Sequence, residues 1–277
     1  MRRRRKNDGF SLTEVLLSVG ILTVGLIFVA GVFPVGIHFA TIASERTIGA
    51  VVADEAFAKI RLYGVDVHDL TRWPGDPLSP LDIDRTLECV DFNDVSYVPL
   101  NFNEFAYPST GVDISEKKFY WSALCRRDGP SSSLVQVTVF VYRKVGTAQR
   151  YRDPVDPTNP NMVIDRPMPV RVAILPVTTV PSDTETNELQ ILDSVPGGDN
   201  IDATFINDDC TIVDDQSGQR FRVLERYISA TDDDIILLDG NWPFTSFTGA
   251  RLVWVVPPPA GGGRNPCIAI YQKEIQF

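Results

Sequence analysis

Hydrophobic and polar positions divide the chain into a charge-free N-terminal stretch and a longer region of alternating pattern. Residues 15–44 contain no Asp, Glu, Lys or Arg, and residues 15–33 are almost wholly apolar. About 20 apolar residues are enough for a helix to cross the hydrocarbon core of a bilayer. We therefore predict a transmembrane helix over about residues 15–36, because no later segment is as long without charge.

The helical pattern continues past the charge-free stretch and becomes amphipathic. Apolar side chains at three- and four-residue spacing form a stripe, which consists of Ile48, Val51, Val52, Ala56, Phe57 and Ile60. Glu55 and Lys59 have the spacing of a helical ion pair, and Gly64 is a suitable stop. The predicted helix therefore covers residues 10–62, about 80 Å at 1.5 Å per residue.

A period of two replaces the helical pattern beyond residue 65. Residues 119–125 and 134–145 flank a turn-forming segment at 127–131, which predicts a β-hairpin. Valine occupies every other position of the second strand and is expected to cover the helical stripe. Further strands are predicted near 170–175, 203–206, 220–227, 235–238, 251–256 and 267–275.

These patterns predict an α+β fold. A long N-terminal helix, with a membrane-spanning half and an amphipathic half, packs on an antiparallel β-sheet head that has additional C-terminal strands. We divide the chain into a basic leader at 1–9, the helix at 10–62, a first part of the head at 65–180 and a C-terminal part at 181–277. One extended sheet and two lobes divided near residue 180 both fit this pattern.

Charge is distributed unevenly along the chain. Five basic residues at positions 2–6 directly precede the apolar stretch, while the whole chain has a formal net charge of −10. Basic residues beside a transmembrane helix stay in the cytoplasm, so everything after residue 45 is expected across the membrane. The acidic balance argues against nucleic acid as a partner, because nucleic-acid binding needs a basic surface.

Two simple interpretations of the N-terminal segment are incomplete. A cleaved signal peptide would need a small-residue site soon after a short apolar core, whereas this apolar run is long and continues into the amphipathic pattern. A simple signal anchor accounts for the charge and the length but not for Glu14. A carboxylate costs about 2.5–3.5 kcal/mol at the centre of a membrane helix, less near its end, and is usually functional.

The residues around Glu14 favour a third interpretation. The basic leader ends in Gly9, Phe10 follows, Glu14 is the fifth residue after Gly9, and an apolar helix begins there. Over residues 1–62 the sequence resembles the type IV pilin superfamily, which includes major and minor pilins and the pseudopilins of type II secretion. The rest of the chain is compatible with that family but matches none of its motifs.

The resemblance implies a processed structural subunit. A prepilin peptidase would cleave between Gly9 and Phe10 and N-methylate the new Phe10 amine. Glu14 would then pair with the Phe10 amine of a neighbouring pilin or pseudopilin subunit during filament assembly, or neutralise the amine of its own chain. Pro34, with the glycines near it, would provide a flexible point or kink as the subunit leaves the bilayer.

The size of the head favours a minor pilin or minor pseudopilin, because a bulky head is hard to repeat at every filament position. Such a subunit of a type IV pilus or related filament crosses the inner membrane once, with its head periplasmic or, after assembly, extracellular. A type II secretion pseudopilin is the nearest alternative. A membrane-anchored binding module without a filament is an alternative of another class, and an anchored periplasmic enzyme is a third.

Four cysteines occur in the head without the CxxC spacing of zinc sites. An oxidising compartment permits two disulfides, and we favour Cys89–Cys125 and Cys210–Cys267 because each pair closes within its own half of the head. Buried free thiols are the alternative.

Acidic clusters at 208–209, 214–215 and 232–234 lack the alternating pattern of an EF-hand. We expect a solvated acidic face, with calcium binding as the alternative. The chain has no GxSxG, HExxH, GxxxxGK or GxGxxG motif. His38 falls in the apolar helix and His68 just past it, so we expect no catalytic residue, metal or cofactor.

Overall fold

The computed structural model describes most of the chain after the leader. The described residues are 11–69, 72–73, 88–98, 100–109, 113, 117–129, 132–144, 151–152, 163–164, 166–177, 185–192, 205–229, 233–243, 250–259 and 265–277. The chain forms two compact units, residues 1–48 and residues 49–277. The predicted leader at 1–9 and the predicted methylation site Phe10 lie outside the described residues.

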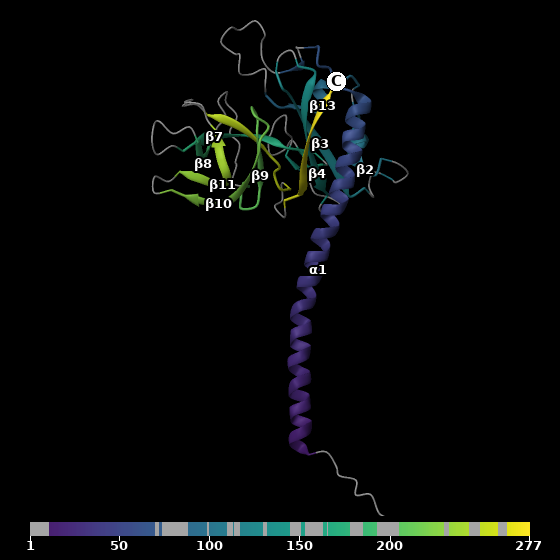
Figure 1. Ribbon diagram of the computed structural model, residues 1–277, viewed down its shortest axis with the longest axis vertical. Coiled ribbons are helices and arrows are strands. Elements are labelled where there is room, and N and C mark those ends of the chain that lie inside the picture. The colour runs from purple at the N-terminus through teal and green to yellow at the C-terminus, as the bar shows by residue number, and fades with distance from the viewer. Residues whose placement is uncertain are drawn as a thin grey trace, which may run out of the picture. The chain divides into compact units, whose positions relative to one another are not determined.

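The N-terminal helix α1 runs without interruption from Leu12–Tyr63 (Figure 1). Among the described helices it is the one that is long and apolar enough, by length and composition, to cross a membrane. Gly64 ends it with a φ of +72° and donates its backbone N–H to the Ile60 carbonyl at 2.9 Å. The predicted helix and its glycine stop are therefore confirmed.

The first sheet is built around the predicted hairpin. Its strands are β1 (Val90–Asp91), β2 (Ala106–Tyr107), β3 (Phe119–Arg127), β4 (Leu134–Arg143) and β13 (Cys267–Gln276). They pair antiparallel in the order β1-β3-β4-β13, and β2 also pairs with β3. Two short helices, α2 (Phe92–Val95) and the 3₁₀ helix η3 (Phe102–Phe105), lie in the connections before β3.

The C-terminal part of α1 packs on one face of this sheet. Lys273 of β13 places its Nζ 4.6 Å from the ring centroid of Phe57 and 3.2 Å from Asp54 Oδ1. Lys273 pairs with Val137 of β4, and paired residues share a face. The valine face of β4 therefore faces α1, as predicted, and Val135, Val137, Val139 and Val141 are fully buried.

The predicted helical stripe is largely confirmed. The fully or nearly fully buried members are Val52, Ala56, Phe57 and Ile60, with Ala53 beside them. Val51 was wrongly included, since half of its surface is exposed. It lies about 100° around the helix from Val52, which takes the buried position. Lys59 and Glu55 form the predicted ion pair at 3.4 Å.

A second sheet closes into an antiparallel barrel, which the sequence did not indicate. Its strands are β7 (Val170–Pro176), β8 (Glu185–Leu192), β9 (Thr211–Asp214), β10 (Arg220–Ile228), β11 (Asp234–Pro243) and β12 (Arg251–Val255). The pairing order is β10-β11-β8-β7-β12-β9. A separate pair consists of β5 (Tyr151–Arg152) and β6 (Val163–Ile164). Along the chain the barrel is inserted between β4 and β13, two neighbours in the first sheet.

Among the described residues, one apolar cluster fills the barrel and another joins the barrel to the first sheet. The barrel has its own core, which includes Ile174, Leu189, Ile212, Phe221 and Trp242. A second cluster is shared by both sheets: Tyr120, Phe140 and Tyr142 of the first sheet pack with Val213 and Trp254 of the barrel. We call this second group the shared cluster. The first sheet is thus covered by α1 on its valine face and by the barrel on its other face.

The α+β class is confirmed, and most predicted strands are found. Four of them belong to the barrel, and the last, at 267–275, belongs to the first sheet. The described residues 205–206 of the predicted strand at 203–206 are not in a strand. Residue 180, where we placed the division of the head, falls between β7 and β8, two neighbours in the barrel.

Candidate membrane and assembly site

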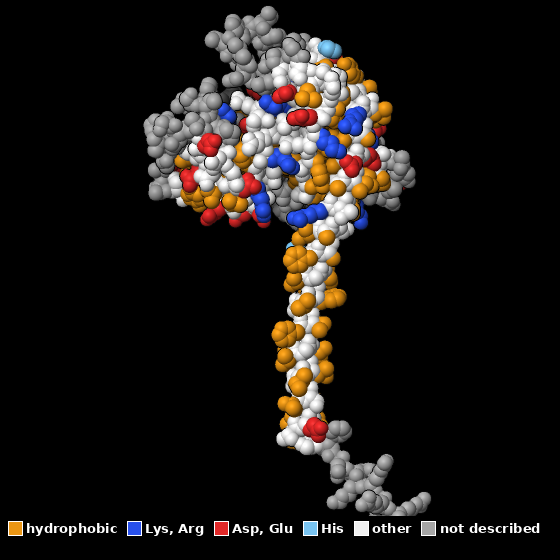
Figure 2. Space-filling view, in the orientation of Figure 1, with side chains coloured by type: hydrophobic (Ala, Val, Ile, Leu, Met, Phe, Trp, Pro, Cys, Tyr) orange, Lys and Arg blue, Asp and Glu red, His pale blue; other side chains and the backbone are white. Residues whose placement is uncertain are grey.

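The first part of α1 presents a continuous apolar surface. Every residue from 11 to 41 is exposed, and Figure 2 shows hydrophobic side chains along this length of the helix. Leu16, Phe28 and Phe33 each expose more than 60% of their surface. Exposed apolar area costs about 25 cal/mol per Å² in water. This surface therefore fits lipid or the apolar surface of other helices.

Three hydroxyl side chains on this surface form hydrogen bonds within the helix itself. Ser18 donates to the Glu14 carbonyl at 2.7 Å, Thr23 to the Val19 carbonyl at 2.7 Å, and Thr41 to the Ile37 carbonyl at 2.9 Å. An unpaired hydroxyl would be costly in hydrocarbon, whereas a hydroxyl bonded to the preceding turn exposes mainly carbon. These residues are therefore compatible with a membrane-spanning segment.

Glu14 is the acidic residue of the first turn of α1. Its backbone N–H donates to the Ser11 carbonyl at 3.0 Å, and its side chain is exposed. The free N–H groups at a helix start stabilise a nearby carboxylate. Glu14 is therefore held at the helix entrance, where it can accept a cationic partner. Gly9 and Phe10, the residues it would act with, lie outside the described residues.

Pro34 lies inside α1 and does not end it. A proline removes one backbone hydrogen bond and crowds the preceding turn, yet the helix continues to Tyr63. A Cβ added at Gly31 or Gly36 would have no atom outside the helix backbone within 4 Å. The kink expected at Pro34 stays a prediction.

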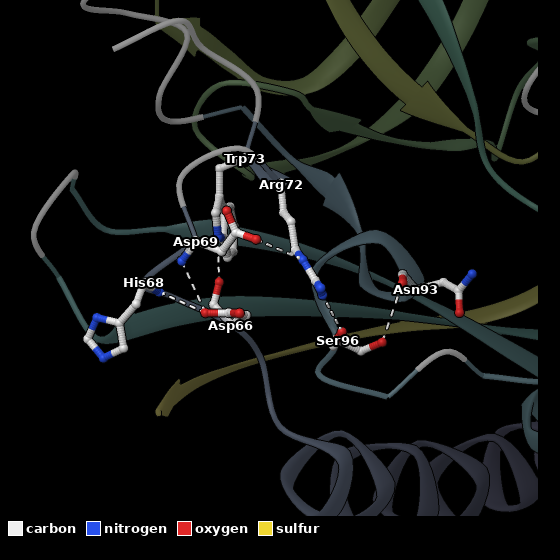
Figure 3. Close-up of polar contacts among 7 residues, drawn as sticks. All are labelled: Asp66, His68, Asp69, Arg72, Trp73, Asn93 and Ser96. Atoms are coloured by element: carbon white, nitrogen blue, oxygen red, sulfur yellow. Dashed lines mark hydrogen bonds and ion pairs between the residues drawn. The ribbon is translucent and has the colours of Figure 1, made fainter.

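A polar cluster fixes the chain just after α1 (Figure 3). Asp66 Oδ1 accepts the backbone N–H groups of His68 and Asp69, each at 3.1 Å, and the Asp66 carbonyl accepts the Trp73 indole N–H at 2.8 Å. Arg72 joins Asp69 at 3.2 Å and the Ser96 carbonyl at 2.8 Å. These polar groups bind one another, so the cluster anchors the loop to the segment after α2.

The imidazole of His68 has no part in those bonds. Figure 3 shows the ring pointing away from the other labelled residues. His38, the other histidine, is exposed on the apolar part of α1, with its ring centroid 6.2 Å from that of Phe39. Among the described residues, neither ring forms a contact with an acid or nucleophile that would make a catalytic pair.

All four cysteines are free thiols in the structure, so neither favoured disulfide is formed in it. The strand register of the first sheet explains why Cys89 and Cys125 are not bonded to each other. Cys125 pairs with Val137 on the α1 side, while Cys89 packs with Tyr120 in the shared cluster on the other side. Side chains on opposite faces of a sheet cannot be bridged without moving the backbone.

The acidic clusters do not form one solvated face. Asp208 and Asp209 are exposed, as expected. Asp214 and Asp215 are each only 2% exposed, so that expectation is wrong for this pair. Asp214 caps a turn: its Oδ2 accepts the Ser217 N–H at 2.9 Å and the Ser217 hydroxyl at 2.6 Å. Such a bonded carboxylate can be buried.

Asp215 belongs to a buried polar group that the sequence did not reveal. Its Oδ1 accepts the Trp254 indole N–H at 2.5 Å and lies 3.7 Å from Arg171 Nη2. The same Nη2 donates to the Cys89 carbonyl at 3.1 Å. Burial raises the pKa of Asp215 to about 7, although Arg171 and the Trp254 bond act in the opposite direction. These residues link the barrel to the strand end at Cys89.

One pocket in the described part of the head lies beside β10. This shallow pocket of about 450 Å³ is lined by Asn207, Asp208, Arg226, Tyr227 and Ile228. Arg226 is already paired with Asp234, and its Nη1 donates to the Ile206 carbonyl at 2.8 Å. Within the described ranges no group of three or more His, Cys, Asp and Glu could hold a metal ion.

Comparison with models of known protein families and with curated protein sequences finds no match for this chain.

Proposed function

We propose that the chain is a minor pilin or pseudopilin-like subunit that is anchored in the inner membrane and assembles into a filament through α1. A prepilin peptidase removes residues 1–9 and methylates the amine of Phe10. The single observation that carries the proposal is the start of α1: a long exposed apolar helix with a carboxylate, Glu14, in its first turn.

The physical role of Glu14 supports this proposal over a simple anchor. Cleavage after Gly9 leaves a positive amine on Phe10, close to the entrance of an apolar helix. A charge in such surroundings is costly unless it is paired. Glu14 supplies the opposite charge. An ion pair between one subunit's amine and its neighbour's carboxylate fixes the axial position of two helices whose surfaces are otherwise apolar.

The architecture of residues 49–277 supports a minor rather than a repeating subunit. The first sheet and the C-terminal part of α1 already form a packed unit, and the barrel adds six strands inserted between β4 and β13. A barrel of this size occupies space beside each subunit. We infer that the subunit takes a position where that space is free, and that the head performs no catalysis.

Intact-mass measurement of natively purified protein tests the processing step. The expected mass is that of residues 10–277 plus one methyl group. A membrane-bound chain that still carries Met1 contradicts the proposal and leaves the anchored binding module as the better description.

A substitution at Glu14 tests assembly separately from processing. Glu14→Ala should leave cleavage intact and reduce incorporation into sheared filaments at least tenfold, because the Phe10 amine loses its partner. Glu225→Ala is the matched control, since Glu225 is an exposed glutamate on β10 outside the proposed interface. Equal incorporation of both variants would remove the pairing role of Glu14.

A further inference from the structure

Two cysteines from distant parts of the chain both contact the side chain of Asn265. Cys210 precedes β9 and belongs to the barrel core, while Cys267 begins β13 and packs against the shared cluster. The side chain of Asn265 contacts both: its Nδ2 donates to Cys210 Sγ at 3.6 Å, and its Oδ1 accepts the Cys267 N–H at 2.9 Å. One amide side chain therefore bridges the two residues.

The register places the Cys267 thiol on the side where Cys210 lies. Cys267 pairs with Tyr142, a member of the shared cluster on the barrel side of the sheet. Burial raises the pKa of the Cys267 thiol to about 12, and the nearby Cys210 adds to this rise. The Cys267 thiol therefore lies on the barrel side of the first sheet, and the contact of Asn265 with both cysteines is the geometric evidence that the two are neighbours.

The other two cysteines give a contrast within the same molecule. Val90 is the register partner of Cys125, so Cys89, one residue earlier, turns its side chain to the opposite face. Cys89 lies in the shared cluster, whereas Cys125 lies on the valine face with Val137. The sheet itself separates these thiols.

We propose that Cys210 and Cys267 are a disulfide-forming pair that fastens the barrel to β13 under oxidising conditions, and that Cys89 and Cys125 remain thiols. The bond closes a loop of 57 residues (267 − 210). It would add a covalent link between the barrel and the first sheet to the two backbone connections, after β4 and before β13. A role for this bond in the cell rests on the proposed extracytoplasmic location of the head. Formation of the bond in the purified protein does not depend on that location.

The reaction is an exchange with an added disulfide, such as oxidised glutathione. One protein thiolate attacks a glutathione sulfur, forms a mixed disulfide and releases one glutathione thiolate. The second protein thiolate then attacks the protein sulfur of the mixed disulfide and releases the second glutathione. The protein loses two protons and two electrons, and one glutathione disulfide becomes two glutathione thiols. Because Cys267 is a weak acid, exchange is expected to be faster at pH 8.5 than at pH 7.

The experiment uses the full chain, purified in detergent with a reductant and then incubated with oxidised glutathione. Free thiols are alkylated, and the unreduced protein is digested and mapped by mass spectrometry. We expect a crosslinked peptide pair that contains Cys210 and Cys267, with Cys89 and Cys125 alkylated. Four alkylated thiols, a lasting glutathione adduct, an intermolecular bond or a Cys89–Cys125 bond would each overturn the proposal.

Variants and a stability measurement make the assignment specific. Cys210→Ser and Cys267→Ser should each abolish the crosslinked peptide, whereas Cys125→Ser should retain it. In the wild type the reductant should lower Tm by roughly 5–10 °C, and in Cys267→Ser it should have no effect. The crosslinked-peptide map of the wild-type protein shows whether Cys210 and Cys267 form the bond, even if a variant fails to fold. Failure of this test leaves the processing and Glu14 experiments unaffected.

Discussion

Asp215 shows how burial changes the chemistry of a single acidic residue. It is bonded to Trp254 and close to Arg171, but desolvation dominates and raises its pKa to about 7. The folded protein therefore holds a proton on Asp215 between about pH 4 and pH 7, where the unfolded chain has released it. A state that binds more protons is favoured at lower pH. This residue consequently makes the fold less stable as the pH rises through that window.

Asp215→Asn should remove this pH dependence, because asparagine can accept the Trp254 hydrogen bond without ionising. The free energy of unfolding of the variant relative to the wild type should increase between pH 4.5 and pH 7, by at most about 1.4 kcal/mol per pH unit. Urea titrations at several pH values measure it. Glu225→Gln, on the exposed face of β10, should give a curve parallel to the wild type. A parallel curve for Asp215→Asn would contradict the assigned ionisation.

The sequence predicted residues whose role depends on near neighbours in the chain and missed those whose role depends on distant ones. The Glu55–Lys59 pair follows from helical spacing alone. The burial of Asp215 depends on Trp254 and Arg171, which come from other strands of the barrel. Separation of Cys89 from Cys125 required the register of β1 against β3, which composition does not show.

At the scale of elements, two glycines lead to opposite predictions: Gly64, which directly follows α1, and Gly49, which is inside it. Gly64 has a φ of +72°, and a Cβ there would lie 2.8 Å from Tyr97 Cδ2. Gly64→Ala should therefore lower the free energy of unfolding by about 1–3 kcal/mol. Gly49 is inside the helix, and its added Cβ would meet Ile268 Cδ1 at 3.5 Å, an ordinary contact. Gly49→Ala should raise stability by up to about 1 kcal/mol.

Urea unfolding of the two variants in the same detergent measures both effects. Because each substitution adds one methyl group, one inside α1 and one directly after it, the pair separates backbone strain from a general effect of side-chain size. A loss of stability in both variants would show that α1 has no room for the extra methyl at either position.

Long or strongly patterned elements were predictable, and short polar ones were not. Helix α1 and the β3–β4 hairpin have many residues in one consistent period. By contrast, β8 is a polar segment in which only Leu189 and Ile191 are buried, and β9 has four residues. These strands exist because the barrel supplies partners on both sides. Barrel closure depends on those pairings, so local pattern could not predict it.

At the scale of the whole molecule, the site of insertion decides how the head unfolds. The barrel leaves the first sheet after β4 and returns at β13, and the two strands pair along nearly their full length. The shared cluster joins Phe140 of β4 to Trp254 of β12. Without the barrel, that face of the sheet would expose Phe140 and Tyr142, which are now fully buried. Residues 49–277 are therefore expected to unfold as one cooperative unit.

Hydrogen exchange of the full chain in detergent tests this expectation. Slowly exchanging amides of β4 and of β12 should show the same opening free energy, because both become exposed in the same global unfolding. Trp254→Ala should lower both values equally, by about 3 kcal/mol, although Trp254 lies in only one of the two strands. Leu224→Ala, at a residue with half of its surface exposed, should change neither by more than about 0.5 kcal/mol. If Trp254→Ala lowers protection in β12 alone, the barrel is a separate folding unit, and the shared cluster does not couple it to the sheet.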